Sequence, residues 1–223
     1  LAHQQLLAKA KSGGIDLYFL GDSITRRWGA LDYPDFLAHW RKTFHGWNAG
    51  NFGWGGDRTE NILWRLENGE LDGVNPKVIV LLAGTNNVGR EPGDEATVKD
   101  VTRGLQAIVD ACRKKAPAAT IVLVAIFPRN DNPAVMPTIA RINANLAKMA
   151  DGKAIRFLDV NDYRLAYVEE GTGSPAILLI HGSMSDCRAW VQSITTAALA
   201  VAVFISTISA RLIQQGIWRA PKS

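Results

Sequence analysis

A serine, a glycine and an asparagine occupy positions in this sequence from which a hydrolytic site could be assembled. Ser23 lies in residues 21–25 (GDSIT), directly after the apolar run 17–20, which predicts a buried strand. Open α/β sheets place reactive groups at the carboxyl ends of such strands. A serine there becomes a nucleophile once a base takes its proton. Because Asp-Ser is also a common helix cap, the motif alone leaves both roles open.

Two later segments supply hydrogen-bond donors for the oxyanion of a tetrahedral intermediate. Gly56 offers a backbone N–H that no side chain shields, just before a helix expected to begin near Arg58, whose dipole favours negative charge. Asn86 follows the next strand and carries a side-chain amide. A turn glycine and a cap asparagine would explain each residue singly. The serine, glycine and asparagine on consecutive strand ends together favour acyl-transfer chemistry.

The elements that would position these residues alternate between strands and helices. The predicted strands cover about 15–20, 47–52, 78–82, 121–127 and 155–160. The predicted helices cover parts of residues 1–14, 34–44, 58–68, 98–112 and 139–149. This alternation implies right-handed crossovers and a parallel sheet. We therefore expect a three-layer α/β domain with a flavodoxin-like, five-stranded parallel sheet, the fifth strand at an edge and the serine near the middle.

Two helix signals make specific predictions. Residues 57–60 (DRTE) have the Asp-x-x-Glu form of a helix cap, which assigns the cap to Asp57. A longer helix downstream has one apolar stripe, which predicts its buried face. The residues of that stripe are Val98, Val101, Leu105, Ile108, Val109 and Cys112.

Composition argues against several classes of function. The chain of 223 residues fits one domain, its net charge is +4, and its basic runs are short, which argues against nucleic-acid binding. The two cysteines form no disulfide framework, and no Cys/His spacing suggests a metal, so we expect no metal and no cofactor. Residues 189–210 carry no charge, but Ser and Thr interrupt them, which favours a terminal helix packed on the sheet over a membrane span. The chain does not begin with Met, so a secreted or periplasmic form after signal removal and a trimmed cytoplasmic chain both stay open.

The residues around the predicted donors resemble one family. Residues 21–25, 53–57 (GWGGD), 63–71 (LWRLENGEL) and 84–87 (GTNN) resemble the SGNH/GDSL hydrolases. Within that family they look like the branch of the platelet-activating-factor acetylhydrolase catalytic subunits. The resemblance covers roughly residues 12–162.

The resemblance implies a metal-free ester hydrolysis with a preference for short acyl groups. It implies Ser23 as the nucleophile, and the N–H of Ser23, the N–H of Gly56 and the side chain of Asn86 as oxyanion donors. Trp54 and Trp28 are candidates for the walls of an acyl pocket, although core packing is the more common role of a tryptophan.

The fourth block of the family, an Asp-x-x-His after the fifth strand, is missing. Asp159 lies at the end of that strand and Asp162 follows it, but neither has a histidine three residues later. His181 lies downstream and is the candidate base, and Asp162 or Asp186 is the candidate acid partner. If the segment before His181 extends the sheet edge, strand spacing places His181 on the order of 15 Å or more from Ser23. If the segment folds back across the strand ends instead, His181 could reach the crevice, but the hairpin pattern favours the first arrangement.

The C-terminal residues break the alternation of strands and helices. Residues 164–169 and 176–180 are predicted to form a hairpin, followed by an apolar helix. Residues 163–190 resemble the opening strands of an α/β-hydrolase, but the chain has no Gly-x-Ser-x-Gly elbow, which excludes a complete one. We interpret residues 1–223 as a single domain whose segment 163–223 is an atypical C-terminal hairpin and helix, or a rearranged or chimeric end.

Three functions follow from these patterns. The first is a serine esterase that hydrolyses a small ester with a short acyl chain. Whether the chain forms a homo-oligomer is left open. The second is a catalytically impaired SGNH relative that binds an ester, acetylated sugar or carboxylate without efficient turnover, which the missing fourth block favours. The third is a flavodoxin-like ligand binder, but residues 21–25 lack the clustered Ser and Thr of a phosphate-cradling loop.

Overall fold

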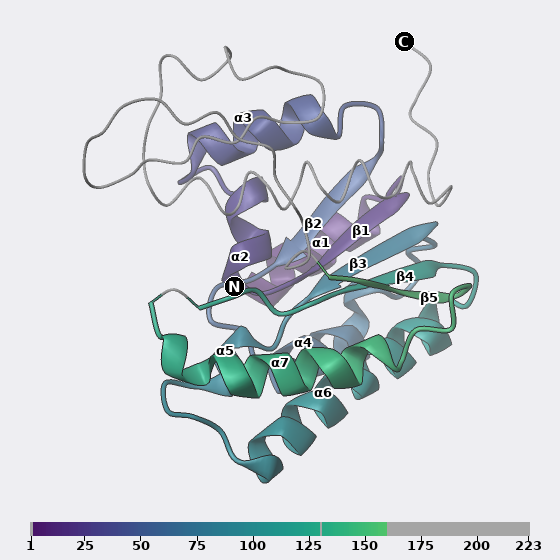
Figure 1. The fold of residues 1–223 in the computed structure, drawn as a ribbon. Coiled ribbons are helices and arrows are strands. Elements are labelled where there is room, and N and C mark those ends of the chain that lie inside the picture. Colours follow the sequence, from purple (N-terminus) through teal and green to yellow (C-terminus); the bar gives the residue numbers. More distant parts are fainter. Residues whose placement is uncertain (1, 130, 160–223) are drawn as a thin grey trace.

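The computed structural model describes residues 2–129 and 131–159 (Figure 1). In this part of the chain, parallel strands form one sheet in the order β2-β1-β3-β4-β5. The strands are β1 (Leu17–Gly21), β2 (Ala49–Gly53), β3 (Val78–Leu82), β4 (Thr120–Val124) and β5 (Ile155–Leu158). The predicted α/β fold with a flavodoxin-like parallel sheet is confirmed, and β5 lies at an edge as expected. The serine strand β1 lies next to the opposite edge, and the order of strands reverses between β1 and β3, which makes that position the switch point.

Helices and short helical turns connect these strands. They are α1 (Ala2–Lys11), α2 (Ser23–Arg26), η1 (Arg27–Gly29), α3 (Pro34–Thr43), α4 (Thr59–Arg65), η2 (Leu66–Glu70), α5 (Thr85–Val88), α6 (Glu95–Lys115), η3 (Pro133–Val135) and α7 (Met136–Ala147). The predicted stripe of α6 is confirmed, because all six of its residues are buried. An amphipathic helix of this kind is held mainly by packing its apolar face on the sheet.

The sheet is covered on both faces, as Figure 1 shows with α6 and α7 against one face and α3 on the other. Successive residues of a strand point to opposite faces. In β3, Ile79 and Leu81 pack in the core with α4, α6 and α7, whereas Val78 and Val80 pack in the core with α3. Burial on both faces explains why Val78–Leu82 is an unbroken apolar run.

The predicted cap at Asp57 is wrong. The N-cap of α4 is Arg58, and the N–H of Thr59 donates to the side-chain oxygen of Asn87 at 3.0 Å. The carboxylate of Asp57 accepts a hydrogen bond from Nε of Arg65 at 2.8 Å instead. A buried guanidinium needs a charged partner, which occupies Asp57, and Asn87 of α5 supplies the acceptor for the N-terminus of α4 in its place.

Several predicted features lie outside the described residues. They are the hairpin at 164–180, the helix after it, the uncharged segment 189–210 and the boundary at 163. Within the described part of the chain, no helix has the length and apolar character that a membrane span requires. The same part contains no group of three His, Cys, Asp or Glu residues arranged to hold a metal ion.

Candidate active site

Three neighbouring strands end in register, which brings the predicted site residues to one edge of the sheet. Gly21 at the end of β1 pairs with Gly53 of β2 on one side and with Leu82 of β3 on the other. The chain leaves each of these positions at the carboxyl end of a parallel strand. The site residues follow within two to four residues: Ser23, Gly56 and Asn86. Ser23 and Asn86 therefore flank the switch point, where open α/β sheets bind their ligands.

Ser23 is the first residue of α2 and is half-buried. The N-cap is Asp22, whose Oδ1 accepts a hydrogen bond from the N–H of Ile24 at 2.9 Å. The sequence left open whether the Asp-Ser pair is a cap or carries a nucleophile. The two residues divide these roles, since Asp22 caps the helix and Ser23 stands beside it in the first turn.

Close packing against β2 fixes the position of α2. A Cβ at Gly53 would lie 2.4 Å from the backbone nitrogen of Arg26, so only glycine fits there. Asn51 connects the two elements, because its Nδ2 donates to the carbonyl of Thr25 at 2.6 Å and its Oδ1 accepts from the N–H of Gly53 at 3.0 Å. Asn51 was not among the predicted site residues, although a polar residue inside a buried strand was a signal for it.

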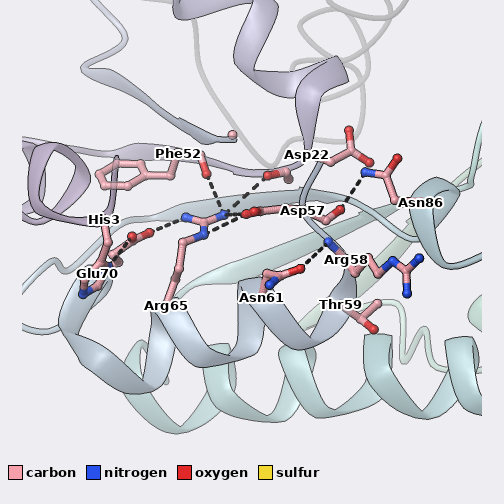
Figure 2. Close-up of polar contacts among 12 residues, drawn as sticks. His3, Asp22, Phe52, Asp57, Arg58, Thr59, Asn61, Arg65, Glu70 and Asn86 are labelled. Carbon is pink, nitrogen blue, oxygen red and sulfur yellow. Dashed lines mark hydrogen bonds and ion pairs between the residues drawn. The ribbon is translucent and has the colours of Figure 1, made fainter. Parts of the chain in front are cut away.

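Gly56 and Asn86 are linked through Asp57. Gly56 has a left-handed φ of 76° and is exposed, with open space where a Cβ would lie. The Nδ2 of Asn86 donates to the carbonyl of Asp57 at 2.7 Å (Figure 2). A side-chain amide has two hydrogens, so one fixes the orientation of Asn86 and the second can serve a ligand.

Two buried carboxylates give the site an acidic character. The pKa of Asp22 is raised to about 6, chiefly by burial, and the nearby carboxylate of Asp57 contributes to this rise. Within the described residues, Oδ2 of Asp22 has no hydrogen-bond partner. Burial also raises the pKa of Asp57, although the guanidinium of Arg65 opposes this effect.

A buried ion-pair network extends from Asp57 away from the strand ends. The guanidinium of Arg65 contacts the carboxylates of Asp57 and Glu70, and Glu70 in turn accepts from Nδ1 of His3 at 2.8 Å. Arg65 was not among the residues that the sequence predicted for the site. One signal was present, because Arg65 directly precedes Leu66 and follows Ile62 by three residues, which places a charge on the apolar face of the helix.

The two candidate tryptophans lie in different surroundings. Trp28 is 1% exposed and packs against Phe36 and His39, so it is a core residue and its predicted place in a pocket wall is wrong. Trp54 is half-buried, and the guanidinium of Arg26 lies 5.5 Å from its ring centroid. Both residues of this pair line a groove of ≈ 390 Å³ beside β2. Ser23, Gly56 and Asn86 do not line this groove, so it does not support Trp54 as a wall of an acyl pocket, and that role stays a prediction.

The candidate base and acid lie beyond the described residues. These residues are His181, Asp162 and Asp186. Asp159 is described, and it directly follows β5. Between residues 2 and 159, apart from residue 130, no histidine hydrogen-bonds to Ser23.

Comparison with known proteins gives concordant matches. The model of the GDSL-like Lipase/Acylhydrolase family matches residues 19–183. Platelet-activating factor acetylhydrolase IB subunit alpha1 of Homo sapiens is 37% identical over 131 residues, which are 59% of this chain and 52% of that protein. The alpha2 subunit of Rattus norvegicus is 34% identical over 164 residues, which are 71% of this chain and 65% of that protein. The chain thus spans about half to two thirds of the length of these relatives.

A solved structure supports the same fold. A GDSL-like lipase from Bacteroides thetaiotaomicron superimposes with a TM-score of 0.60 at 17% identity, covering 96% of each chain. At this identity the likeness concerns the arrangement of helices and strands alone.

Proposed function

The chain belongs to the GDSL-like lipase/acylhydrolase family, and from this premise we propose that it is a serine hydrolase of short acyl esters. The observation that carries the proposal is the in-register ending of β1, β2 and β3. It gathers a hydroxyl and three N–H donors at one edge of the sheet. Relatives named acetylhydrolases support the preference for a short acyl group.

In the proposed reaction, Oγ of Ser23 attacks the ester carbonyl carbon while a base takes its proton. The carbonyl oxygen becomes an oxyanion that accepts hydrogen bonds from the N–H groups of Ser23 and Gly56 and from Nδ2 of Asn86. The intermediate collapses, the C–O bond to the alcohol breaks, and the alcohol leaves with the proton held by the base. Water then attacks the acyl-serine in the same way and releases the acid. His181 is the candidate for this base, and Asp162 or Asp186 is the candidate acid partner.

The proposed oxyanion donors are oriented before the negative charge develops. Asn86 is already oriented by the carbonyl of Asp57, so its free N–H needs no reorganisation when charge develops. Gly56 leaves its surroundings open to an approaching carbonyl oxygen. Preorganised donors of this kind favour the transition state over the bound ester.

A second candidate is a relative that binds an ester or acetylated sugar without efficient turnover. The observation that favours it is the absence of a histidine three residues after Asp159 or Asp162. In that case Ser23 and the donors would still bind a carbonyl group, and no efficient proton acceptor would be present.

Hydrolysis of p-nitrophenyl esters by the full chain tests the two candidates. We expect p-nitrophenyl acetate to be cleaved faster than esters of longer acids, and Ser23→Ala to abolish the cleavage. Ser12→Ala is the matched control, because the hydroxyl of Ser12 is exposed and, among the described residues, donates to the carbonyl of Lys9 at the end of α1. Saturable ester binding without release of nitrophenol would support the binder. Cleavage that persists in Ser23→Ala would refute the proposed nucleophile.

A further inference from the structure

Arg65 lies at the centre of a buried network behind the site (Figure 2). Its side chain is 7% exposed, and the carboxylates of Asp57 and Glu70 are 11% and 0% exposed. Nε of Arg65 donates to Oδ2 of Asp57 at 2.8 Å, and Nη2 lies 2.7 Å from the same oxygen. Nη1 donates to Oε2 of Glu70. One guanidinium thus serves two buried carboxylates.

The same guanidinium also holds two strand ends. Its Nη2 donates to the carbonyl of Phe52 at 3.2 Å and approaches the carbonyl of Gly21 at 3.5 Å. Phe52 and Gly21 are at the carboxyl ends of β2 and β1, directly before the segments that carry Gly56 and Ser23. Arg65 therefore contacts the supports of both backbone donors.

The third donor is connected to Arg65 through one intermediate residue. Arg65 bonds the carboxylate of Asp57, and the carbonyl of Asp57 accepts from Nδ2 of Asn86 at 2.7 Å. Rotation of Asp57 would move the acceptor that orients Asn86. It would also move Gly56, which is its neighbour in the chain.

We propose that Arg65 is a positioning residue that holds the three oxyanion donors in their mutual geometry. The proposal rests on the proposed esterase function, since it concerns the same donors. Arg65 is buried, and it acts through the carboxylate of Asp57 and the carbonyls of Gly21 and Phe52. Arginine suits this task because its planar guanidinium presents five N–H groups in a fixed fork, which the single ammonium group of lysine cannot reproduce.

Substitution of Arg65 should affect kcat differently if this residue only stabilises the fold than if it positions the donors. A buried ion pair that only stabilises the fold would change the free energy of unfolding and leave kcat of the folded protein intact. Misplacement of donors lowers kcat, because transition-state stabilisation depends on their geometry within a fraction of an ångström.

The first test compares Arg65→Lys with Tyr18→Phe in ester hydrolysis below the unfolding temperature of each variant. Tyr18→Phe is the matched control, because it removes a buried hydrogen bond to the backbone carbonyl of Glu70 at 3.0 Å and keeps the ring that stacks on Phe52 and the carboxylates that bind Arg65. We expect Arg65→Lys to lower kcat roughly tenfold to a hundredfold with KM unchanged. Tyr18→Phe should keep kcat. Equal kcat in wild type and Arg65→Lys would overturn the proposal.

A double-mutant cycle with Asn86→Ala identifies the route of the effect. If Arg65 acts through the donors, Arg65→Lys should lower kcat much less in the Asn86→Ala background than in the wild type. Full additivity of the two effects would contradict action through Asn86. Where Arg65→Lys does not fold, Asp57→Asn takes its place, since asparagine keeps the size and one acceptor but loses the charge that holds Arg65.

NMR spectroscopy can test the positioning role of Arg65 without a measurement of ester hydrolysis. In NMR spectra, Arg65→Lys or Asp57→Asn should shift the side-chain amide signals of Asn86 and the backbone amide signal of Gly56, whereas Tyr18→Phe should leave them in place. A wild type without esterase activity would refute the proposed function, and these shifts would still decide the positioning role. Unmoved Asn86 and Gly56 signals would overturn that role even in an active esterase.

Discussion

Replacing Asp22 by asparagine should stabilise the protein at neutral pH, because the native fold buries this carboxylate with little compensation. Asp22 is 0% exposed, its Oδ1 accepts from the N–H of Ile24 at 2.9 Å, and its Oδ2 has no hydrogen-bond partner within the described residues. Burial raises its pKa from 3.8 to about 6, with the carboxylate of Asp57 adding to the effect. Asparagine is neutral, prefers N-cap positions and can keep the bond to Ile24.

The size of the effect follows from the two pKa values of Asp22. Because the folded pKa is raised, the folded state holds the proton more tightly, so the wild type loses stability as pH rises from about 4 to about 6. Each pH unit between the two values corresponds to about 1.4 kcal/mol, which gives about 3 kcal/mol in total. Asp22→Asn should therefore exceed the wild type by about 1 kcal/mol near pH 4.5 and by about 3 kcal/mol near pH 8.

Urea unfolding near these two pH values measures the difference, with Asp94→Asn as a control of opposite sign. Asp94 caps α6 on the surface, and its hydrogen bond from the N–H of Thr97 at 2.8 Å lowers its pKa. Because the pKa of Asp94 is lower in the folded state than in the unfolded state, its carboxylate stabilises the folded protein at pH values above the unfolded-state pKa. This stabilisation is lost as the pH falls, so Asp94→Asn should be less stable than the wild type near pH 8. A stability difference for Asp22→Asn that does not change with pH, or a loss near pH 8, would refute the reasoning for Asp22.

Three further predictions concern the site. Asn86→Ala should lower kcat by about a hundredfold or more with KM nearly unchanged, and a change in KM alone would make it a substrate-binding residue. Gly53→Ala should lower the unfolding temperature strongly, because the new Cβ would lie 2.4 Å from a backbone nitrogen of α2. A Cβ at Gly55 would have no heavy atom within 4 Å, so Gly55→Ala should leave the unfolding temperature unchanged. Equal unfolding temperatures of the two variants would contradict the close packing of α2 on Gly53. His181→Ala should lower esterase activity less than Ser23→Ala does, and an equal loss with an intact circular dichroism spectrum would identify His181 as the base.

The fold was predictable because its signals are local and periodic. The unbroken run of Val78–Leu82 and the stripe along α6 each specify an element and its buried face without knowledge of distant residues. Boundaries were less accurate, as for β2, which begins at Ala49 and not at the predicted 47. Trp47 packs in the core with Phe44 before the strand starts, so its apolar character indicated burial and not strand pairing.

The positions of the site residues could be predicted from the sequence, but the side chains that hold those residues in place could not. Ser23 and Asn86 stand directly after predicted strands, where parallel topology alone brings them to one edge. The role of Asp57 could not be read from its spacing, because its carboxylate binds Arg65 while Asn87, a residue distant in sequence, accepts from the N–H of Thr59 at the helix N-terminus. Sequence patterns report the helical period but not which distant side chain supplies a cap or an ion pair.

Covalent labelling by a fluorophosphonate, located by mass spectrometry of the resulting peptides, tests the central claim most directly. The reagent reacts with a serine only when the hydroxyl is activated and donors stabilise the phosphonyl oxygen. We predict that the label lies on Ser23, that Ser23→Ala takes up none, and that Asn86→Ala is labelled more slowly. A label on another residue, or equal labelling of wild type and Ser23→Ala, would contradict the assignment of Ser23 as the nucleophile.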